Sequence, residues 1–149
     1  MVDLLAQYAL YDTIILIMNK QRVCTWNVRA VHSPIKKRKI ITCLKDDIDV
    51  AILQETHLDD TEHLKLQQGS FGQVFYSSCT TRNGGIAVLI RKNLPFIISD
   101  CVKDLNGRYV KIKGILQGQN IVMMNVYFFI CPPTYLPYQN VSGLSFIPF

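Results

Sequence analysis

Two polar side chains stand at the ends of apolar runs, where they could bind a metal ion together. Asn27 lies near the end of the run at residues 23–28 (VCTWNV), and Glu55 directly follows the run at residues 49–54 (DVAILQ). If these runs are neighbouring parallel strands, about 4.8 Å apart, both side chains emerge at the same carboxyl edge of the sheet. A carboxylate beside a carboxamide suits hydrated Mg²⁺, which takes one or two carboxylates and completes its shell with water and substrate phosphate. In the alternative interpretation, Glu55 is a solvated loop residue and Asn27 is a turn former that ends its strand.

A basic run, KKRK at residues 36–39, could face phosphate groups. It follows Ser33 and Pro34, which are typical of a helix start, so its charges lie at the positive end of the helix dipole and do not stabilise the helix. It belongs to a block, residues 20–45, that holds half of the 16 basic residues and no acid. A solvated basic face or a nuclear-import patch explains the run equally well. The candidate nucleic-acid-binding residues are Arg29, Lys36, Lys37, Arg38 and Lys39.

Histidines and cysteines show no metal-ligand pattern. His32, His57 and His63 lack ligand spacing, so we expect exposed loop residues and assign no metal to them. The five cysteines lie tens of residues apart without a CxxC pair, which argues against a disulfide framework and against a structural zinc site. A reducing compartment fits this usage best.

The polar candidates must be positioned by an α/β unit. Residues 23–28 and 49–54 are predicted strands, and between them Ile40, Ile41, Leu44 and Ile48 fall on one face of a predicted helix that Ser33 and Pro34 begin. The order strand, helix, strand implies a right-handed crossover between parallel strands.

Four further strands are predicted downstream, at residues 73–78, 85–91, 107–116 and 120–127. The segment at 85–91 is apolar throughout and should be central. The segment at 107–116 alternates, with Val110 and Ile112 on one face and lysines on the other, so it should be half exposed. Asn106-Gly107 is a strong turn signal. The fold class is therefore α/β, with a mixed sheet and one early βαβ crossover.

Composition indicates one domain with atypical ends. The chain has 149 residues and a net charge of +5, which mildly favours nucleic acid as a partner. Residues 1–21 are an atypical apolar leader without a clear period, either an unrelated leader or an added apolar element. Residues 128–149 are an uncharged tail with four of the six prolines, and we expect no regular element there. No membrane span or secretion signal is visible, so a nuclear or cytoplasmic location is expected.

Five ordered motifs resemble the first half of the endonuclease/exonuclease/phosphatase family. The nearest resemblance is to the apurinic-site-type endonuclease domain of non-LTR (LINE-type) retrotransposons. The motifs are TWNVR at residues 25–29, LQETHL at 53–58, GGIAVLI at 84–90, GRYV at 107–110 and MNVY at 124–127. Each motif alone is weak, and QETHL is the most specific. Residues 22–127 would then be the N-terminal half of this domain.

The resemblance implies a two-sheet, four-layer α/β sandwich that cuts a DNA phosphodiester with Mg²⁺ and an activated water. It implies that Glu55 and Asn27 are metal ligands, that Asn27 also faces the phosphate, and that Tyr127 contacts the scissile phosphate. Without the resemblance, Tyr127 would be interpreted as a buried sheet aromatic.

Departures from the family pattern indicate a truncated, inactive fragment. The family continues after NVY with an Ala-Pro-Asn turn, whereas here residues 128–132 are FFICP. The tail has no Asp or His, so the GDFN motif with the catalytic Asp and the SDH motif with the general-base His are missing. Loss of the second sheet would expose an apolar sheet face and allow self-association, unless the tail covers it. The alternatives are a non-catalytic nucleic-acid or protein-binding fragment that uses the 20–45 block, and a family phosphatase acting on a small phosphoester.

Overall fold

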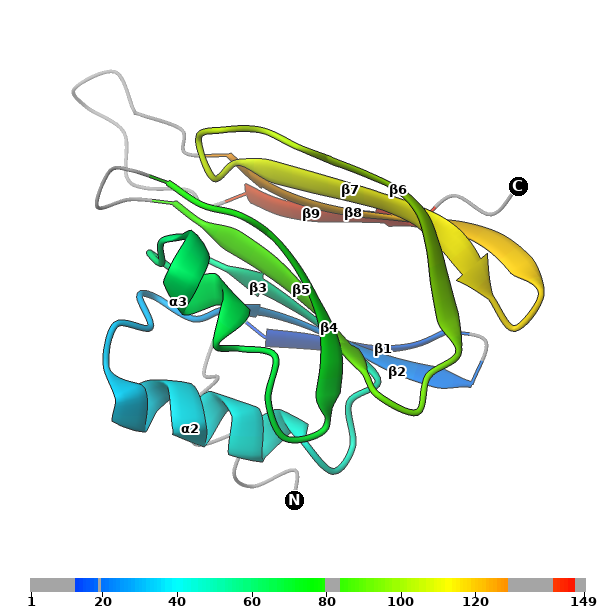
Figure 1. Cartoon of the computed structure of the whole chain (residues 1–149), viewed down its shortest axis with the longest axis horizontal. Coiled ribbons are helices and arrows are strands. Elements are labelled where there is room, and N and C mark those ends of the chain that lie inside the picture. The colour runs from blue at the N-terminus through cyan, green and yellow to red at the C-terminus, as the bar shows by residue number, and fades with distance from the viewer. Residues whose placement is uncertain (1–12, 19, 80–83, 129–140, 147–149) are drawn as a thin grey trace.

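Two β-sheets are stacked face to face, and the helices lie on the outer side of the first sheet (Figure 1). The computed structural model describes residues 13–18, 20–79, 84–128 and 141–146. This architecture confirms the predicted α/β fold class with two sheets. No helix in the described part of the chain has the length and apolar character needed to cross a membrane.

The first sheet has five strands and contains the predicted parallel pair. In sheet order the strands are β1 (Thr13–Met18), β2 (Gln21–Asn27), β3 (Val50–Gln54), β5 (Ile86–Arg91) and β4 (Phe71–Ser77). β2 and β3 are parallel, and the other neighbours are antiparallel. The strands predicted at 23–28, 49–54, 73–78 and 85–91 are therefore confirmed, and β5 is an interior strand as expected.

Helix α2 (Pro34–Leu44) makes the predicted crossover from β2 to β3. Ser33 is its N-cap residue with an extended backbone, and Pro34 occupies the first turn. The predicted apolar face is buried, because Ile40, Ile41 and Leu44 belong to one core cluster with Trp26 and residues of β3. A second, short helix, α3 (Asp60–Leu64), follows β3 and was not predicted.

The second sheet is antiparallel and covers the inner face of the first. Its strands, in order, are β6 (Phe96–Lys103), β7 (Tyr109–Leu116), β8 (Gln119–Phe128) and β9 (Val141–Phe146). Val110 and Ile112 of β7 are fully buried while Lys113 is exposed, which confirms the predicted alternation. They share a core cluster with Ile52 and Val88 of the first sheet. The interface between the sheets is therefore a closed apolar core.

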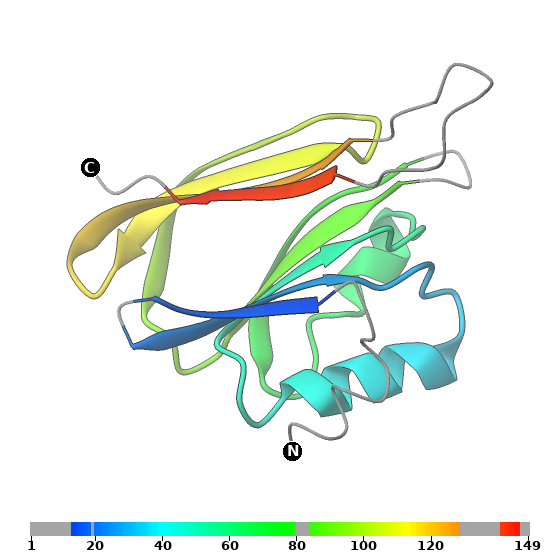
Figure 2. The same cartoon turned by 180° about the vertical axis from the view of Figure 1, so that it is seen from behind.

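Two expectations are wrong, and a strand occupies the segment for which the sequence left two alternatives open. The second sheet is present, so the inner face of the first sheet is not exposed. β9 lies in the predicted irregular tail, between Pro137 and Pro148, because its six residues contain no proline and can pair along the edge of β8. β1 lies in the predicted leader and forms a hairpin with β2. Figure 2 shows these two edge strands from behind, β1 in the lower sheet and β9 in the upper.

The large exposed apolar side chains in the described part of the chain are mostly on the second sheet. Ile97 is 66% exposed, and Val102 and Ile115 are each 40% exposed. Self-association through an apolar sheet face stays a prediction.

Candidate active site

Asn27 and Glu55 lie at the same edge of the first sheet. Asn27 ends β2 and is in parallel register with Gln54, the last residue of β3 and the neighbour of Glu55. The two chains stay paired beyond the strands, because the Ala30 amide donates to the Glu55 carbonyl (2.7 Å) and the Val31 amide to the Thr56 carbonyl (3.0 Å). The sequence prediction that both side chains emerge at one carboxyl edge is confirmed.

The Asn27 side chain is held in place by the backbone that follows it. Only 9% of its surface is exposed, and its Oδ1 atom accepts a hydrogen bond from the Arg29 amide at 3.1 Å. Arg29 has a φ of +46°, which lets the chain turn back over the side chain. A carboxamide oxygen has two lone pairs, so this contact leaves Asn27 able to accept a second partner.

The Glu55 carboxylate is bonded to the second sheet. Tyr127, on β8 and 3% exposed, donates from its hydroxyl to Glu55 Oε1 at 2.5 Å. In the described part of the chain this is the only side-chain hydrogen bond to the carboxylate, so Oε2 remains available. Tyr127 is therefore buried, as the alternative interpretation expects, and it also contacts Glu55; its role at the phosphate stays a prediction.

The loop that carries Glu55 has a strained backbone held by glycines. Glu55 and His57 have φ values of +52° and +54°, in the left-handed region that non-glycine residues rarely adopt. The Thr56 amide donates to the Gly85 carbonyl (2.9 Å) and the His57 amide to the Gly84 carbonyl (3.0 Å). A Cβ atom on Gly85 would lie 2.6 Å from Thr56 Oγ1. The GG motif therefore permits the close approach that fixes the Glu55 loop.

Three polar residues beside this loop were not predicted as part of the site. Thr56 Oγ1 is 2.7 Å from His63 Nε2, and His63 Nδ1 is 2.8 Å from Ser78 Oγ. His63 is fully buried, so its expected exposure is wrong. Burial lowers the pKa of His63 to about 4, although Asp59 and Asp60 nearby act in the opposite direction. The only sequence signal is Asp59 followed by Glu62, which is typical of a helix N-terminus.

Asn125, the second residue of the MNVY motif, joins the sheets below the site. Its Nδ2 atom donates to the carbonyls of Leu53 (3.0 Å) and Ala87 (3.1 Å), and its Oδ1 atom accepts from Gln54 Nε2 at 3.3 Å. The side chain is 1% exposed. In the sequence, a role for Asn125 is indicated by its position in the MNVY motif. Its hydrogen-bond partners can be identified only from the tertiary structure.

The predicted basic residues split into two groups. Lys37 is buried and forms an ion pair with Glu62, which also pairs with Lys65, so a solvated face is wrong for Lys37. Arg38 and Lys39 are exposed, and Lys36 donates to the Arg29 carbonyl at 2.9 Å. A cavity of about 660 Å³ lies between α2 and α3, and its lining residues are His32, Pro34, Lys37, Arg38, Glu62, Lys65 and Gln68.

This cavity adjoins the edge that carries Glu55. The rings of His32 and His57 have centroids 6.1 Å apart, and His57 is two residues from Glu55. Burial lowers the pKa of His57, the Glu55 carboxylate acts against that shift, and His32 and Lys36 act with it.

The donor set at this edge fits a hydrated divalent ion. The described residues contain no cluster of three or more His, Cys, Asp or Glu side chains that could hold a metal. Zinc would need such a cluster, whereas Mg²⁺ is commonly held by one or two carboxylates, with water and substrate supplying the other ligands. Glu55 Oε2 and Asn27 Oδ1 are oxygen donors of the required kind.

Comparison with known proteins agrees with this geometry. A model of the Endonuclease/Exonuclease/phosphatase family matches residues 24–144, from β2 into β9. The family comprises nucleases and phosphatases, which hydrolyse phosphoesters and typically use divalent metal ions. The match covers most of the 149 residues and includes Asn27, Glu55 and Tyr127. The chain therefore belongs to the endonuclease/exonuclease/phosphatase family.

Proposed function

We propose that this chain carries the metal-binding part of a Mg²⁺-dependent DNA endonuclease of the apurinic-site, retrotransposon-derived type. The observation that carries the proposal is the Tyr127 hydroxyl bonded to the Glu55 carboxylate at the edge where Asn27 also ends. Family membership and the five motifs support phosphodiester hydrolysis, and the QETHL and NVY motifs favour the nuclease branch.

Each side chain of the site has a role in this proposal. Glu55 Oε2 and Asn27 Oδ1 would hold the ion, while Tyr127 orients the carboxylate and lies where the scissile phosphate would bind. When bound, Mg²⁺ supplies charge compensation for the phosphoryl oxygens and the leaving group of an in-line displacement. Arg29 and Lys36, near Asn27, would contact backbone phosphates of the substrate.

We infer that the 149 residues do not hydrolyse DNA by themselves. Residues 105–149 contain no Asp, Glu or His, so this part of the chain offers no general base. His63 cannot take that role, because both ring nitrogens are engaged in buried hydrogen bonds.

Two measurements test the proposal. In ¹H–¹⁵N NMR spectra, Mg²⁺ should shift the amides of Asn27, Glu55 and Thr56 in the wild-type chain but not in Glu55→Gln. Absence of these shifts in the wild type would contradict the metal site. In a plasmid-nicking assay with Mg²⁺ we expect no cleavage, and nicking that Glu55→Ala abolishes would contradict the inferred inactivity.

A second candidate function is non-catalytic nucleic-acid binding through the basic block. The supporting observation is the cavity between α2 and α3, whose lining carries Lys37, Arg38 and Lys65 against one acid, Glu62. The double variant Arg38→Gln/Lys65→Gln should weaken binding to a DNA duplex and reduce its salt dependence by about 0.9 in log–log slope per lost phosphate contact. Lys113→Gln, an exposed lysine on β7 outside the basic block, is the control. Equal affinity of the double variant and the control would exclude this surface.

A further inference from the structure

His63 is a buried titratable side chain that the proposed chemistry does not use. Its ring lies between two hydroxyl groups, Thr56 Oγ1 at 2.7 Å from Nε2 and Ser78 Oγ at 2.8 Å from Nδ1. It also stacks on Tyr76, with ring centroids 4.9 Å apart and an interplanar angle of 8°. Three elements therefore meet at this ring: the Glu55 loop, α3 and β4.

The loop needs such support because its backbone is unfavourable. Glu55 and His57, two of three successive residues, have left-handed φ values, which are unfavourable for non-glycine residues unless surrounding contacts hold them. The backbone bonds to Gly84 and Gly85 hold one side of the loop. The Thr56 hydroxyl lies close to Gly85 and the side chain is fully buried, so the hydroxyl must find a partner within the protein.

We propose that His63 is a positioning residue for Glu55: its ring fixes the Thr56 hydroxyl, and through Thr56 it holds the left-handed backbone that aims the Glu55 carboxylate at Tyr127. The importance of that aim for metal binding rests on the proposed function. The effect of His63 on the conformation of the loop does not depend on the proposed function, and it can be measured separately.

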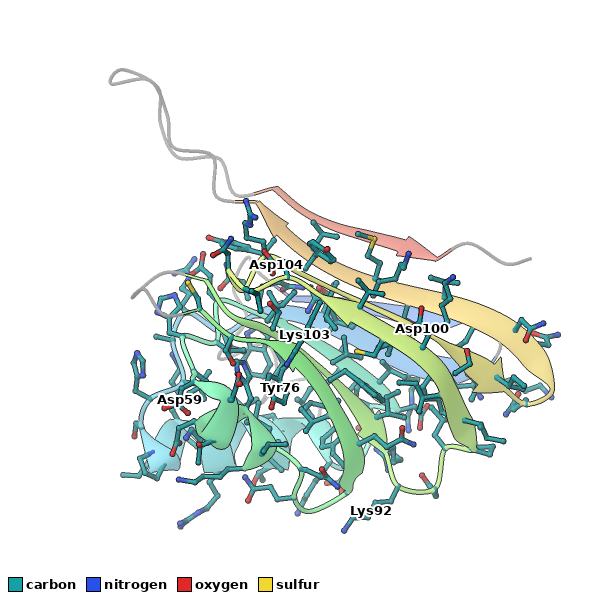
Figure 3. The ribbon with its side chains drawn as sticks, turned by 45° about the horizontal axis from the view of Figure 1, so that its top comes forward. Asp59, Tyr76, Lys92, Asp100, Lys103 and Asp104 are labelled. Carbon is teal, nitrogen blue, oxygen red and sulfur yellow. The ribbon has the colours of Figure 1, made fainter. Side chains whose placement is uncertain are left out.

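Charged groups around the His63 ring act on its protonation in opposite directions. Asp59 and Asp60, at the start of α3, favour a protonated ring, whereas Lys103 of β6 opposes it. Lys103 also lies over the Tyr76 ring, with its Nζ atom 4.4 Å from the centroid. Figure 3 shows Tyr76 and Lys103 beside each other, with Asp59 at the start of α3. A neutral ring donates at one nitrogen and accepts at the other, whereas a protonated ring donates at both and adds a charge to a dry site.

If His63 only stabilised the fold as a whole, replacing it would increase the opening of loop and strand amides equally. If His63 holds the Glu55 loop, replacing it increases the opening of the loop amides most. Amide hydrogen exchange in ¹⁵N-labelled full-length chain reports local opening at Thr56 and His57, and the Val88 and Leu89 amides in β5 report global unfolding. His63→Leu should raise the opening constant of the Thr56 and His57 amides about tenfold more than that of the β5 amides, because a buried hydrogen bond is lost. His63→Gln, which keeps a neutral donor and acceptor, should restore most of the protection.

The pH dependence supplies a second readout that does not require the leucine variant to fold. In the wild type, opening at Thr56 and His57 should increase relative to β5 as the pH falls from 6 towards 4. In His63→Gln that increase should be absent, and in Asp100→Asn, which alters an exposed side chain on β6, it should be unchanged.

Two results would overturn the proposal. One is a parallel change of the loop and β5 amides in His63→Leu. The other is the same pH profile in His63→Gln as in the wild type. The Mg²⁺-induced shift of the Glu55 amide is recorded on the same samples. If the wild type shows no such shift, the proposed function fails while the exchange result still decides the role of His63.

Discussion

The Tyr127 hydroxyl donates a hydrogen bond to the Glu55 carboxylate, and the two residues come from different sheets, 72 positions apart in sequence. The bond brings the β8 strand to the carboxyl edge of β3. A carboxylate at that edge is thereby held in one orientation before any ion binds, which lowers the entropic cost of binding.

Replacing Tyr127 with Phe removes this hydrogen bond and keeps the aromatic packing. We expect a loss of about 1–2 kcal/mol in the free energy of unfolding, because a hydrogen bond to a charged group is lost. We also expect weaker Mg²⁺ binding in the NMR titration. Tyr109→Phe, on the half-exposed face of β7, is the control and should leave Mg²⁺ binding unchanged. Equal Mg²⁺ affinities of the two variants would show that Tyr127 does not orient the carboxylate.

Stability should fall on acidification because of His63. Burial lowers its pKa from 6.5 to about 4 in the folded chain, so between these values the unfolded chain binds more protons than the folded one. The free energy of unfolding therefore decreases as the pH falls through this window, by on the order of 3 kcal/mol in total. Urea unfolding at several pH values measures this slope. His63→Gln should flatten it, and an unchanged slope would mean that other groups cause it.

Gly85→Ala tests the close approach at the Glu55 loop. Gly85 has a φ of +81°, and a Cβ atom there would lie 2.6 Å from Thr56 Oγ1 and 3.1 Å from the His57 nitrogen. Gly118 has a similar φ of +79° with no atom within 4 Å of its Cβ position, so Gly118→Ala measures the backbone cost alone, about 1 kcal/mol. Thermal unfolding should show a clearly larger loss for Gly85→Ala. Similar losses would mean that the contact with Thr56 can relax.

Asp104→Asn should destabilise the connection between β6 and β7. Burial by itself raises the pKa of Asp104, but hydrogen bonds from Arg108, Ser77 and the Tyr109 amide outweigh it and lower the pKa to about 2. The stabilisation is therefore present above about pH 3.8 and is lost as the pH falls towards 2. Urea unfolding at pH 7 should show a loss of about 1–3 kcal/mol. Asp100→Asn, an exposed position on β6, is the control, and equal losses would contradict the role of the hydrogen bonds.

The sequence predicts the part of the site that depends on local pattern. Two short apolar runs with a helix between them define the parallel pair, and the pair places Asn27 and Glu55 at one edge without further information. Tyr127 is found only through the motif resemblance, because its partner lies in the other sheet and no spacing rule connects them.

The missed elements lack the patterns on which such predictions depend. β6 is exposed at every position after Phe96 and contains a bulge near Ile98, so its side chains do not alternate by burial. β9 is short and lies in a proline-rich stretch, which hides its pairing with β8. His63 is buried only because α3 packs on β4, and a single histidine in a polar stretch carries no signal of that contact.

The bonds of Asn125 also limit how the sandwich can deform. Its amide reaches carbonyls in two neighbouring strands of the opposite sheet, so a one-residue slip of β8 along its axis would break both contacts and reverse the direction of its side chains. Sliding of one sheet over the other would therefore have to break these two hydrogen bonds. A partner molecule that shifted this alignment would separate the hydroxyl of Tyr127 from Glu55 without touching either residue.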